Sequence, residues 1–277
     1  MDWSQVTPAT LLATVGLNAL LLLLIVLVVW LWRRRQPMTD VKLRHMVGKL
    51  QKKRAAAWDG TVPFDGDFSR MRAMQETLAD GLPASRTVTA LLLGWVAQKQ
   101  VSLCESPKKH LQSFGDPMQV TLCFQLDRDT GKGAEGLLLS LLYGWADETA
   151  TLQKSEIYSH ARTYYDAVDG RLRQIELQGR HGLRAAGEMQ PEQKTRRFGF
   201  LDEHRQLYTP RGVREAVNLC RYRAWLDQQP QLAPEQWRDA ALLGCTNGID
   251  ETQLTLAQAL ADALVDGARA GHKIHSL

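Results

Sequence analysis

Two acidic residues directly follow the most strand-like segment of the chain. The alternating run QVTLCFQL, residues 119–126, leads into the motif DRDT, which contains Asp127 and Asp129. A carboxylate at the end of a strand can act as the nucleophile of phosphoryl transfer, with a second carboxylate nearby as general acid or base. Gly131 follows, and we find neither further parallel strands nor a pair of acidic metal ligands. A charged hairpin turn, DRDTGKG, explains the same residues, and we favour that interpretation.

The other reactive residue types are too scattered to form a site. The cysteines are Cys104, Cys123, Cys220 and Cys245, with no C-x-x-C pair and no histidine at metal-ligand spacing. We therefore expect reduced, mostly buried thiols, as in a cytoplasmic compartment. His272 and His275 lack further ligands, and solvated tail residues explain them. The sequence predicts no catalytic residue, no metal site, no cofactor and no enzymatic activity.

The positive charge of the chain is concentrated in one segment. Of the net charge of +4, residues 33–54 contribute +8, from nine Lys or Arg against the single Asp40. Residues 55–277 hold 25 basic and 28 acidic side chains, so the remainder of the chain is slightly acidic. An acidic balance opposes a surface that tracks nucleic-acid phosphates. Nucleic acid is therefore not expected as the partner.

A long apolar segment precedes this basic run. Residues 11–32 carry no charge and only Thr14 and Asn18 as polar side chains. Crossing a hydrocarbon layer of about 30 Å takes about 20 helical residues, so we predict a transmembrane helix at residues 9–32. A cleaved signal peptide has basic residues before its apolar run, whereas here Asp2 precedes it and the arginines follow.

The flanks of the predicted membrane helix predict its orientation. Basic residues are retained on the cytoplasmic side, which places residues 1–8 outside and the C-terminal domain in the cytoplasm of a bacterium, with the helix in the inner membrane. Indole rings favour the membrane interface. The predicted interface residues are Trp30, Trp32, Arg33, Arg34 and Arg35.

The segment at residues 33–60 is interpreted as a basic juxtamembrane stem and linker. The run VKLRHMVGKLQKKR has apolar residues near one face of a helix and basic residues around the rest. It could lie along anionic lipid headgroups, pack on a protein partner, or form a solvated linker. The turn-rich sequence WDGTVPFDGD, residues 58–67, then separates the stem from the folded part.

The remaining sequence predicts a mostly helical α+β domain with one or two winged-helix-like subdomains, at residues 61–190 and 191–277. Hydrophobic periodicity and turn residues carry this prediction. Helices are expected at residues 68–78, 87–99, 134–145, 154–177, 210–228 and 254–270, and strands at 101–103, 119–126, 197–201 and 206–208. Thr209 is suited to cap the helix that Pro210 begins.

Several of these segments resemble a known family. They are TALLLGWVAQKQVSL, AEGLLLSLLYGW, YTPRGVREAVNLCRYRAWLDQ and WRDAALLGC, which together cover about residues 87–245. This order is similar to the cytoplasmic part of the YciQ-like bacterial predicted membrane proteins of unknown function. Those proteins also carry an extracytoplasmic domain and further membrane spans that this chain lacks. The resemblance implies a fold and a location, and no reaction.

The functional prediction is a scaffold or adaptor in a membrane-bound protein assembly, with membrane lipids and protein partners and an open oligomeric state. The alternative is a membrane-tethered winged-helix DNA-binding regulator that binds DNA through the second winged-helix-like unit, which contains Arg211, Arg214, Arg221 and Arg223. Large aromatic residues are enriched at interface hot spots. The candidate partner contacts are Trp145, Tyr158, Trp225 and Trp237, most of which are also candidates for the core.

Overall fold

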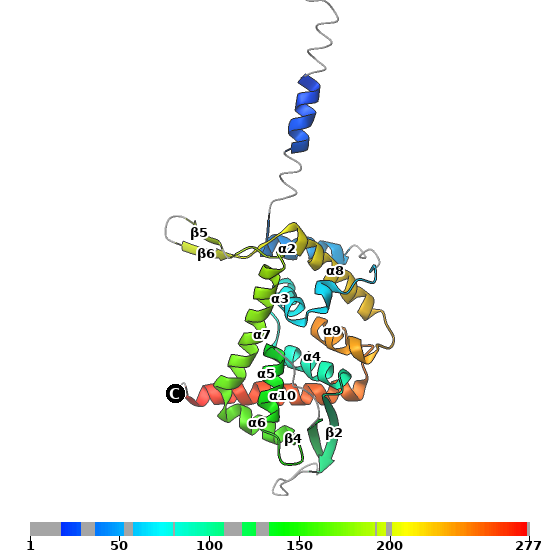
Figure 1. The fold of residues 1–277 in the computed structure, drawn as a ribbon, viewed down its shortest axis with the longest axis vertical. Helices are drawn as coiled ribbons and strands as arrows, with labels where there is room; N and C mark the ends of the chain where they lie inside the picture. The colour runs from blue at the N-terminus through cyan, green and yellow to red at the C-terminus, as the bar shows by residue number, and fades with distance from the viewer. Residues whose placement is uncertain are drawn as a thin grey trace, which may run out of the picture.

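Helices make up most of the described chain, and small antiparallel sheets complete it (Figure 1). The computed structural model describes residues 18–28, 37–52, 58–79, 81–107, 118–125, 133–191, 193–197 and 201–275. The prediction of a mostly helical α+β domain is confirmed for these residues. The predicted division at residues 190 and 191 stays a prediction.

Nine of the helices that the structure describes belong to the domain. They are α2 (Asp40–Lys52), α3 (Phe68–Ala79), α4 (Ala84–Ala97), α5 (Ala134–Tyr143), α6 (Lys154–Thr163), α7 (Tyr165–Ala185), α8 (Pro210–Asp227), α9 (Pro234–Leu243) and α10 (Glu251–His275), with a short 3₁₀ turn, η2, at Pro63–Gly66. Hairpins separate α4 from α5 and α7 from α8. Local signals account for several boundaries. At α8, for example, the Thr209 hydroxyl accepts a hydrogen bond from the Gly212 N–H, and Pro210 occupies the first turn.

The transmembrane prediction is wrong for the part of the chain that the structure describes. Of the apolar segment at residues 9–32, only residues 18–28 are described, as a helix with exposed side chains. Eleven helical residues rise by about 16 Å, roughly half of a hydrocarbon layer of about 30 Å. No helix among the described residues is both long enough and apolar enough to cross a membrane.

The predictions that depended on that span change with it. A bitopic, single-pass protein of a bacterial inner membrane, with its N-terminus outside and its C-terminal domain in the cytoplasm, is contradicted by the lack of a spanning helix among the described residues. The predicted interface residues Trp30, Trp32, Arg33, Arg34 and Arg35 lie outside the residues that the structure describes. The prediction depended on the apolar composition of residues 9–32, whereas a span requires a helix of about 20 residues, and the described residues contain none that is apolar enough.

The largest sheet has three strands. β2 (Val101–Pro107) pairs antiparallel with β3 (Met118–Phe124), and β4 (Thr151–Gln153) pairs with the other edge of β3. The helix that leads into this hairpin, α4, is the one predicted. The third strand, however, comes from a later part of the chain, after α5, so the first winged-helix-like unit is not formed in the predicted order.

The strands before α8 also pair differently from the prediction. β5 (Gln193–Arg197) pairs with β6 (Leu201–Arg205) in a separate hairpin. β7 (Leu207–Tyr208), which leads into α8, pairs instead with β1 (Met38–Thr39) at the start of the domain. The prediction of a second winged-helix-like unit is therefore wrong, because the strand next to α8 pairs with a strand that is far away in the sequence.

The turn-rich segment at residues 58–67, interpreted as the boundary between the stem and the folded part, contacts α8. The Phe64 side chain is buried, and its backbone N–H donates a hydrogen bond to the Glu215 carboxylate on α8 at 3.1 Å. The side-chain amide of Asn218, one turn further along α8, donates to the Thr61 carbonyl at 3.0 Å. Trp58 packs on the same helix through Trp225, with 4.6 Å between the ring centroids and an angle of 41° between the ring planes. Residues 58–66 thus tie the start of the domain to α8.

Helix α10 crosses the lower part of the molecule beside α4 and α6 (Figure 1). Its glycines allow a close approach to α6. A Cβ atom at Gly267 would lie 2.5 Å from the Tyr158 carbonyl oxygen, and one at Gly271 would lie 2.4 Å from the Arg162 carbonyl oxygen. The apolar face of α10 joins the common core through Leu260 and Leu264. The last helix is therefore a structural support for α4 and α6.

Candidate functional site

The four predicted aromatic contacts lie in different parts of the structure. Trp225 is half-buried and packs against Trp58 and Tyr222, at centroid distances of 4.6 and 6.0 Å. Trp237 is half-buried, and its indole N–H donates to the Leu232 carbonyl at 3.1 Å. These two tryptophans pack against the core. Trp145 is also half-buried but lies beside the exposed Tyr164 at the surface, and Tyr158 is 38% exposed.

Three rings are stacked at that surface and form what we name the aromatic row: Trp145, His160 and Tyr164. The Trp145 and His160 rings lie 5.4 Å apart at an interplanar angle of 16°, and the His160 and Tyr164 rings lie 6.3 Å apart at 15°. Trp145 and Tyr164 are 6.2 Å apart at 23°. The three planes are nearly parallel, and the three centroids form a triangle with sides of 5.4, 6.2 and 6.3 Å.

Local structure fixes the three rings in place. Gly144 ends α5, and Trp145 follows directly. The next turn is held by the Asp147 carboxylate, which accepts hydrogen bonds from the backbone N–H groups of Thr149 and Thr151 at 3.0 and 2.9 Å. Helix α6 then starts with a capping box, in which the Glu156 carboxylate accepts from the Gln153 N–H at 2.7 Å.

His160 and Tyr164 are neighbours on one side of the chain because they are four residues apart. Tyr164 leaves the helical conformation, with φ −111° and ψ 39°, and separates α6 from α7 where one continuous helix at residues 154–177 was predicted. This break leaves Tyr164 52% exposed. Tyr158, 38% exposed, is two residues from His160 and therefore lies on the opposite side of α6.

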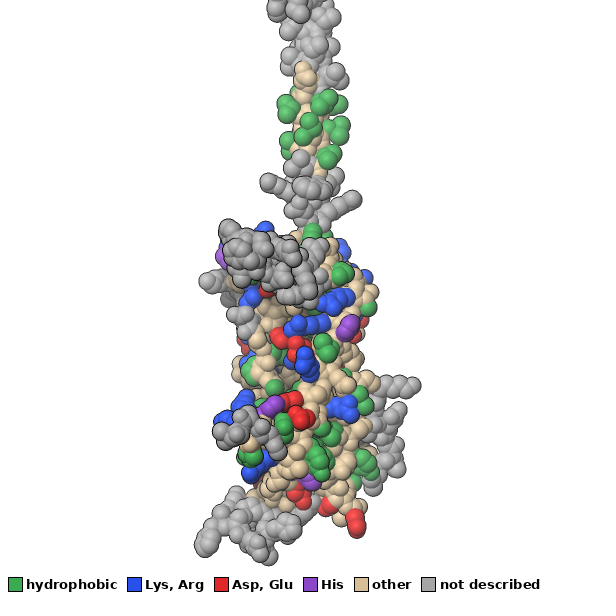
Figure 2. Space-filling model, turned by 90° about the vertical axis from the view of Figure 1, so that its left-hand side faces the viewer, with side chains coloured by type: hydrophobic (Ala, Val, Ile, Leu, Met, Phe, Trp, Pro, Cys, Tyr) green, Lys and Arg blue, Asp and Glu red, His purple; other side chains and the backbone are tan. Residues whose placement is uncertain are grey.

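The row belongs to a mixed surface. Figure 2 views the molecule from the side on which α6 and α7 lie, and hydrophobic side chains gather there between charged groups, mainly in the lower half. Large exposed hydrophobic residues on α5, α7 and the junction of α6 with α7 include Leu137, Tyr143, Tyr164 and Leu177. Aromatic groups within a charged surrounding are typical of protein contact surfaces.

A cluster of buried polar groups between α8 and α9 is fully paired. The Tyr222 hydroxyl donates to Asp239 at 3.3 Å, and the Arg238 guanidinium donates to Asp239 at 3.1 Å and to the Gly66 carbonyl at 3.1 Å. Burial raises the pKa of Asp239, an effect that Arg238 and the Tyr222 hydrogen bond oppose. Since these groups satisfy one another, we assign them to structure.

A second buried pair joins α3 to the turn before β5. The Glu188 side chain is completely buried and accepts hydrogen bonds from two nitrogens of the Arg70 guanidinium. Burial raises the pKa of Glu188, whereas Arg70 lowers it, and the net direction is upward. Arg211 of α8 lies 3.8 Å from the same carboxylate. This arrangement also occupies one of the arginines considered for DNA binding.

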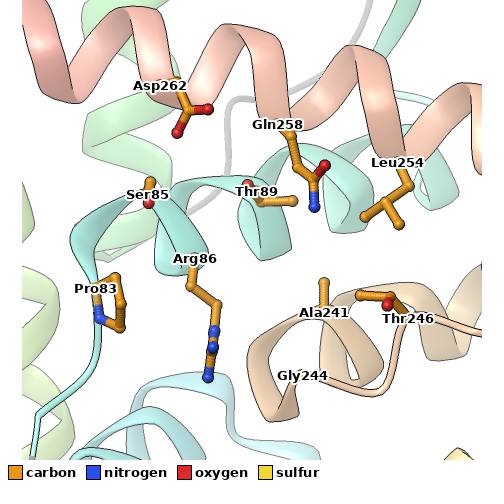
Figure 3. Close-up of a pocket in the computed structure, with 10 residues that line it drawn as sticks. All are labelled: Pro83, Ser85, Arg86, Thr89, Ala241, Gly244, Thr246, Leu254, Gln258 and Asp262. Atoms are coloured by element: carbon orange, nitrogen blue, oxygen red, sulfur yellow. The ribbon is translucent and has the colours of Figure 1, made fainter.

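A pocket of about 410 Å³ lies between α4, α9 and α10 (Figure 3). The N-terminal turn of α4, the end of α9 and one face of α10 supply its walls. The lining residues are Pro83, Ser85, Arg86, Thr89, Ala241, Gly244, Thr246, Leu254, Gln258 and Asp262. Gly244 ends α9 with φ +77°, a left-handed conformation that glycine adopts without strain.

The prediction of mostly buried cysteines holds for two of the four. Cys220 and Cys245 are buried, but Cys104 is exposed and Cys123 is half-buried. These two lie on neighbouring strands, with their sulfur atoms 3.4 Å apart.

The described residues contain no group of three or more His, Cys, Asp or Glu side chains that could hold a metal ion. His272 contacts Asp169 at 2.6 Å. Asp127 and Asp129 lie outside the described residues.

Comparisons with known proteins add no assignment. No family model, no curated protein and no solved structure matches the chain. The resemblance to YciQ-like proteins therefore stays a prediction.

Of the three residues of the aromatic row, only Trp145 was predicted from the sequence. The four-residue spacing of His160 and Tyr164 is the signal that could have indicated the other two.

Proposed function

We propose that this chain is a non-catalytic adaptor that binds a protein partner through the aromatic row of Trp145, His160 and Tyr164. The observation that carries the proposal is the group of rings itself: three nearly parallel rings within 5.4–6.3 Å of one another, of which Tyr164 is 52% exposed. Tryptophan and tyrosine are enriched among the residues that dominate binding free energies. The row therefore supplies the kind of anchor that a protein interface requires.

The rigidity of the row supports the same function. Asp147 holds the turn after Trp145, and the capping box holds the start of α6. A contact group that is already ordered loses less conformational entropy on binding. The stacked rings can thus bury area against a partner without a preceding rearrangement of this part of the chain.

The charges of α8 favour a protein partner over DNA. Arg211 faces the buried Glu188, and Glu215 on the same helix accepts the hydrogen bond from Phe64. A phosphate-binding surface requires cations that are free to release counterions on contact with the nucleic acid. The acidic balance of residues 55–277 acts in the same direction.

Site-specific photocrosslinking tests this proposal in cells that produce the full-length chain. A benzophenone amino acid replaces Tyr164 in one variant and Tyr158 in the other. Both positions are exposed, but Tyr158 lies on the side of α6 opposite His160 and so outside the aromatic row, which makes the second variant a matched control. We expect a defined protein to be crosslinked from position 164 and not from position 158.

Two results would overturn the proposal. The first is the same set of crosslinked proteins from both positions, which would indicate random encounters. The second is an absence of protein crosslinks at position 164 together with recovery of nucleic acid, which would favour the DNA-binding alternative. Circular dichroism of both variants establishes that each chain is folded before the comparison is made.

A further inference from the structure

The outer face of the hairpin of β2 and β3 carries two thiols. Cys104 lies opposite Thr121 and Cys123 lies opposite Ser102, so the two cysteines are diagonal neighbours. Residues that lie opposite one another, and residues two apart along a strand, point to the same face of a sheet. The side chains of Cys104 and Cys123 therefore share one face, and their sulfur atoms are 3.4 Å apart.

The fold holds this pair in place and leaves it accessible. The opposite face of the hairpin belongs to the core through Val101, Leu103 and Leu122, which are all buried. The two strands pair with one another along their whole length. Cys104 is exposed and Cys123 is half-buried. A reagent can thus reach two thiols whose separation is set before it arrives.

The separation of the sulfur atoms selects the kind of atom that can bridge them. With a bond of about 2.3 Å to each, two sulfur atoms 3.4 Å apart subtend an angle of about 95° at the bridging atom. Three-coordinate trivalent arsenic is pyramidal and bonds to two thiols at such an angle. Zinc prefers the wider tetrahedral angle, and two-coordinate Cu(I) prefers a straight line, so both would require the sulfur atoms to move apart.

The protonation of the pair favours the same element. Burial, together with the neighbouring Cys104, raises the pKa of Cys123 to about 11, so this thiol keeps its proton at neutral pH. Binding of a metal cation requires thiolates and releases their protons. Arsenous compounds instead condense with neutral thiols: two As–O bonds break, two As–S bonds form, and the thiol hydrogens leave in water. Arsenic stays trivalent, so the step needs neither an oxidant nor a reductant.

From this geometry we propose that Cys104 and Cys123 form a dithiol site that captures trivalent arsenic compounds with two exchangeable oxygen ligands. The third substituent of the arsenic, a hydroxyl or an organic group, faces solvent beside the exposed Cys104. The Ser102 hydroxyl already hydrogen bonds to the Cys123 sulfur, so a polar group borders the site. This inference does not depend on the proposed protein-binding function.

Phenylarsine oxide, a trivalent arsenical with one fixed organic group, tests the proposal on the full-length chain. Native mass spectrometry should show one adduct per chain, heavier than the protein by the reagent less one water. Two bonds to the same chain make the second one intramolecular and raise the affinity by a factor of about 10² or more. Excess 2-mercaptoethanol, a monothiol, should therefore remove little of the adduct, whereas the dithiol 2,3-dimercaptopropanol should remove it completely.

Matched variants assign the adduct to its residues. Cys104→Ser and Cys123→Ser each leave one thiol of the pair, and either should lower the concentration of 2-mercaptoethanol that removes half of the adduct by about hundredfold or more. Cys220→Ala and Cys245→Ala change the two buried thiols and should leave that concentration unchanged. Circular dichroism establishes that each variant is folded.

Three outcomes would overturn the inference. The first is that the wild type loses the adduct at the same concentration of 2-mercaptoethanol as Cys104→Ser does. The second is that the adduct survives in Cys104→Ser and Cys123→Ser but not in Cys220→Ala or Cys245→Ala, which would place it at the buried thiols. The third is that an equimolar amount of Zn²⁺ prevents the adduct in the wild type, which would make the pair a metal-ion site.

Discussion

The hairpin of β2 and β3 brings two cysteines within reach of one another. Cys104 lies opposite Thr121, so Cys123 is its diagonal neighbour, and the sulfur atoms are 3.4 Å apart. Burial and the neighbouring Cys104 raise the pKa of Cys123 to about 11. The sequence analysis expected mostly buried, unpaired thiols, because neither the strand pairing nor the exposure of Cys104 can be seen in the spacing of the cysteines.

We expect the diazene oxidant diamide to join these two thiols. Both thiol hydrogens are transferred to diamide, which becomes a hydrazine, as the disulfide forms. The rate should rise as the pH approaches the raised pKa of Cys123, because the thiolate is the nucleophile. Intact mass after alkylation checks the result. Cys104→Ser should prevent the loss of the two hydrogens, and an unchanged loss in that variant would contradict the assignment.

Asp239 should make stability depend on pH. Burial raises its pKa in the folded protein above the value in the unfolded chain, so the folded state binds the proton more tightly. The contribution of the Asp239 carboxyl to the free energy of unfolding is complete below the pKa that it has in the unfolded chain. It decreases as the pH rises through the pKa that the carboxyl has in the folded protein. Relative to Asp239→Asn, the wild type should therefore gain stability as the pH falls from 7 toward 4.

Urea unfolding of both proteins across this range measures the effect. Only the difference between wild type and Asp239→Asn reports on this carboxyl, since the other titrating groups are common to both. A difference that is constant with pH, or that changes in the opposite direction, would show that Arg238 and Tyr222 outweigh the burial of the carboxylate.

At the scale of elements, the contact between α6 and α10 depends on the absence of side chains. A Cβ at Gly267 would meet the Tyr158 carbonyl at 2.5 Å and the Ala161 methyl at 2.9 Å. We expect Gly267→Ala to lower the free energy of unfolding by about 1–3 kcal/mol, because the two helices must separate. This cost exceeds the gain of about 1 kcal/mol that alanine brings inside a helix.

Gly170 of α7 is the matched control for this prediction. A Cβ there has no neighbour within 4 Å, so Gly170→Ala should stabilise the protein by up to about 1 kcal/mol. Chemical denaturation of the two variants beside the wild type measures both changes. A stabilising Gly267→Ala would mean that α6 and α10 are less tightly packed than the structure places them.

The elements that could be predicted from the sequence are those with local signals. Helices α3, α5 and α8 begin within a residue of their predicted starts, since hydrophobic periodicity and the Thr209 cap act within a few residues. Helix α9 was missed, although Pro234 at its start and Gly244 after its end are the usual signals. The break at Tyr164 has no such signal, because a tyrosine fits a helix interior equally well.

At the scale of the whole molecule, the arrangement depends on contacts between distant segments. β7 pairs with β1 from the opposite end of the domain, and residues 58–66 dock on α8. Periodicity cannot predict such pairs, which is why winged-helix-like units were expected where the strands have other partners. The aromatic row was predicted only at Trp145 for the same reason, since the turn at Asp147 is what brings α6 beside it.

The central claim is that the aromatic row binds a protein partner. The most direct test is the dissociation constant of the crosslinked partner, once purified, for the wild type and for the variants Tyr164→Ser and Tyr158→Ser. Removal of an exposed aromatic anchor costs at least about 1 kcal/mol at a hot spot, so we expect Tyr164→Ser to bind about fivefold or more weakly and Tyr158→Ser to match the wild type. Equal affinities of all three proteins would contradict the claim.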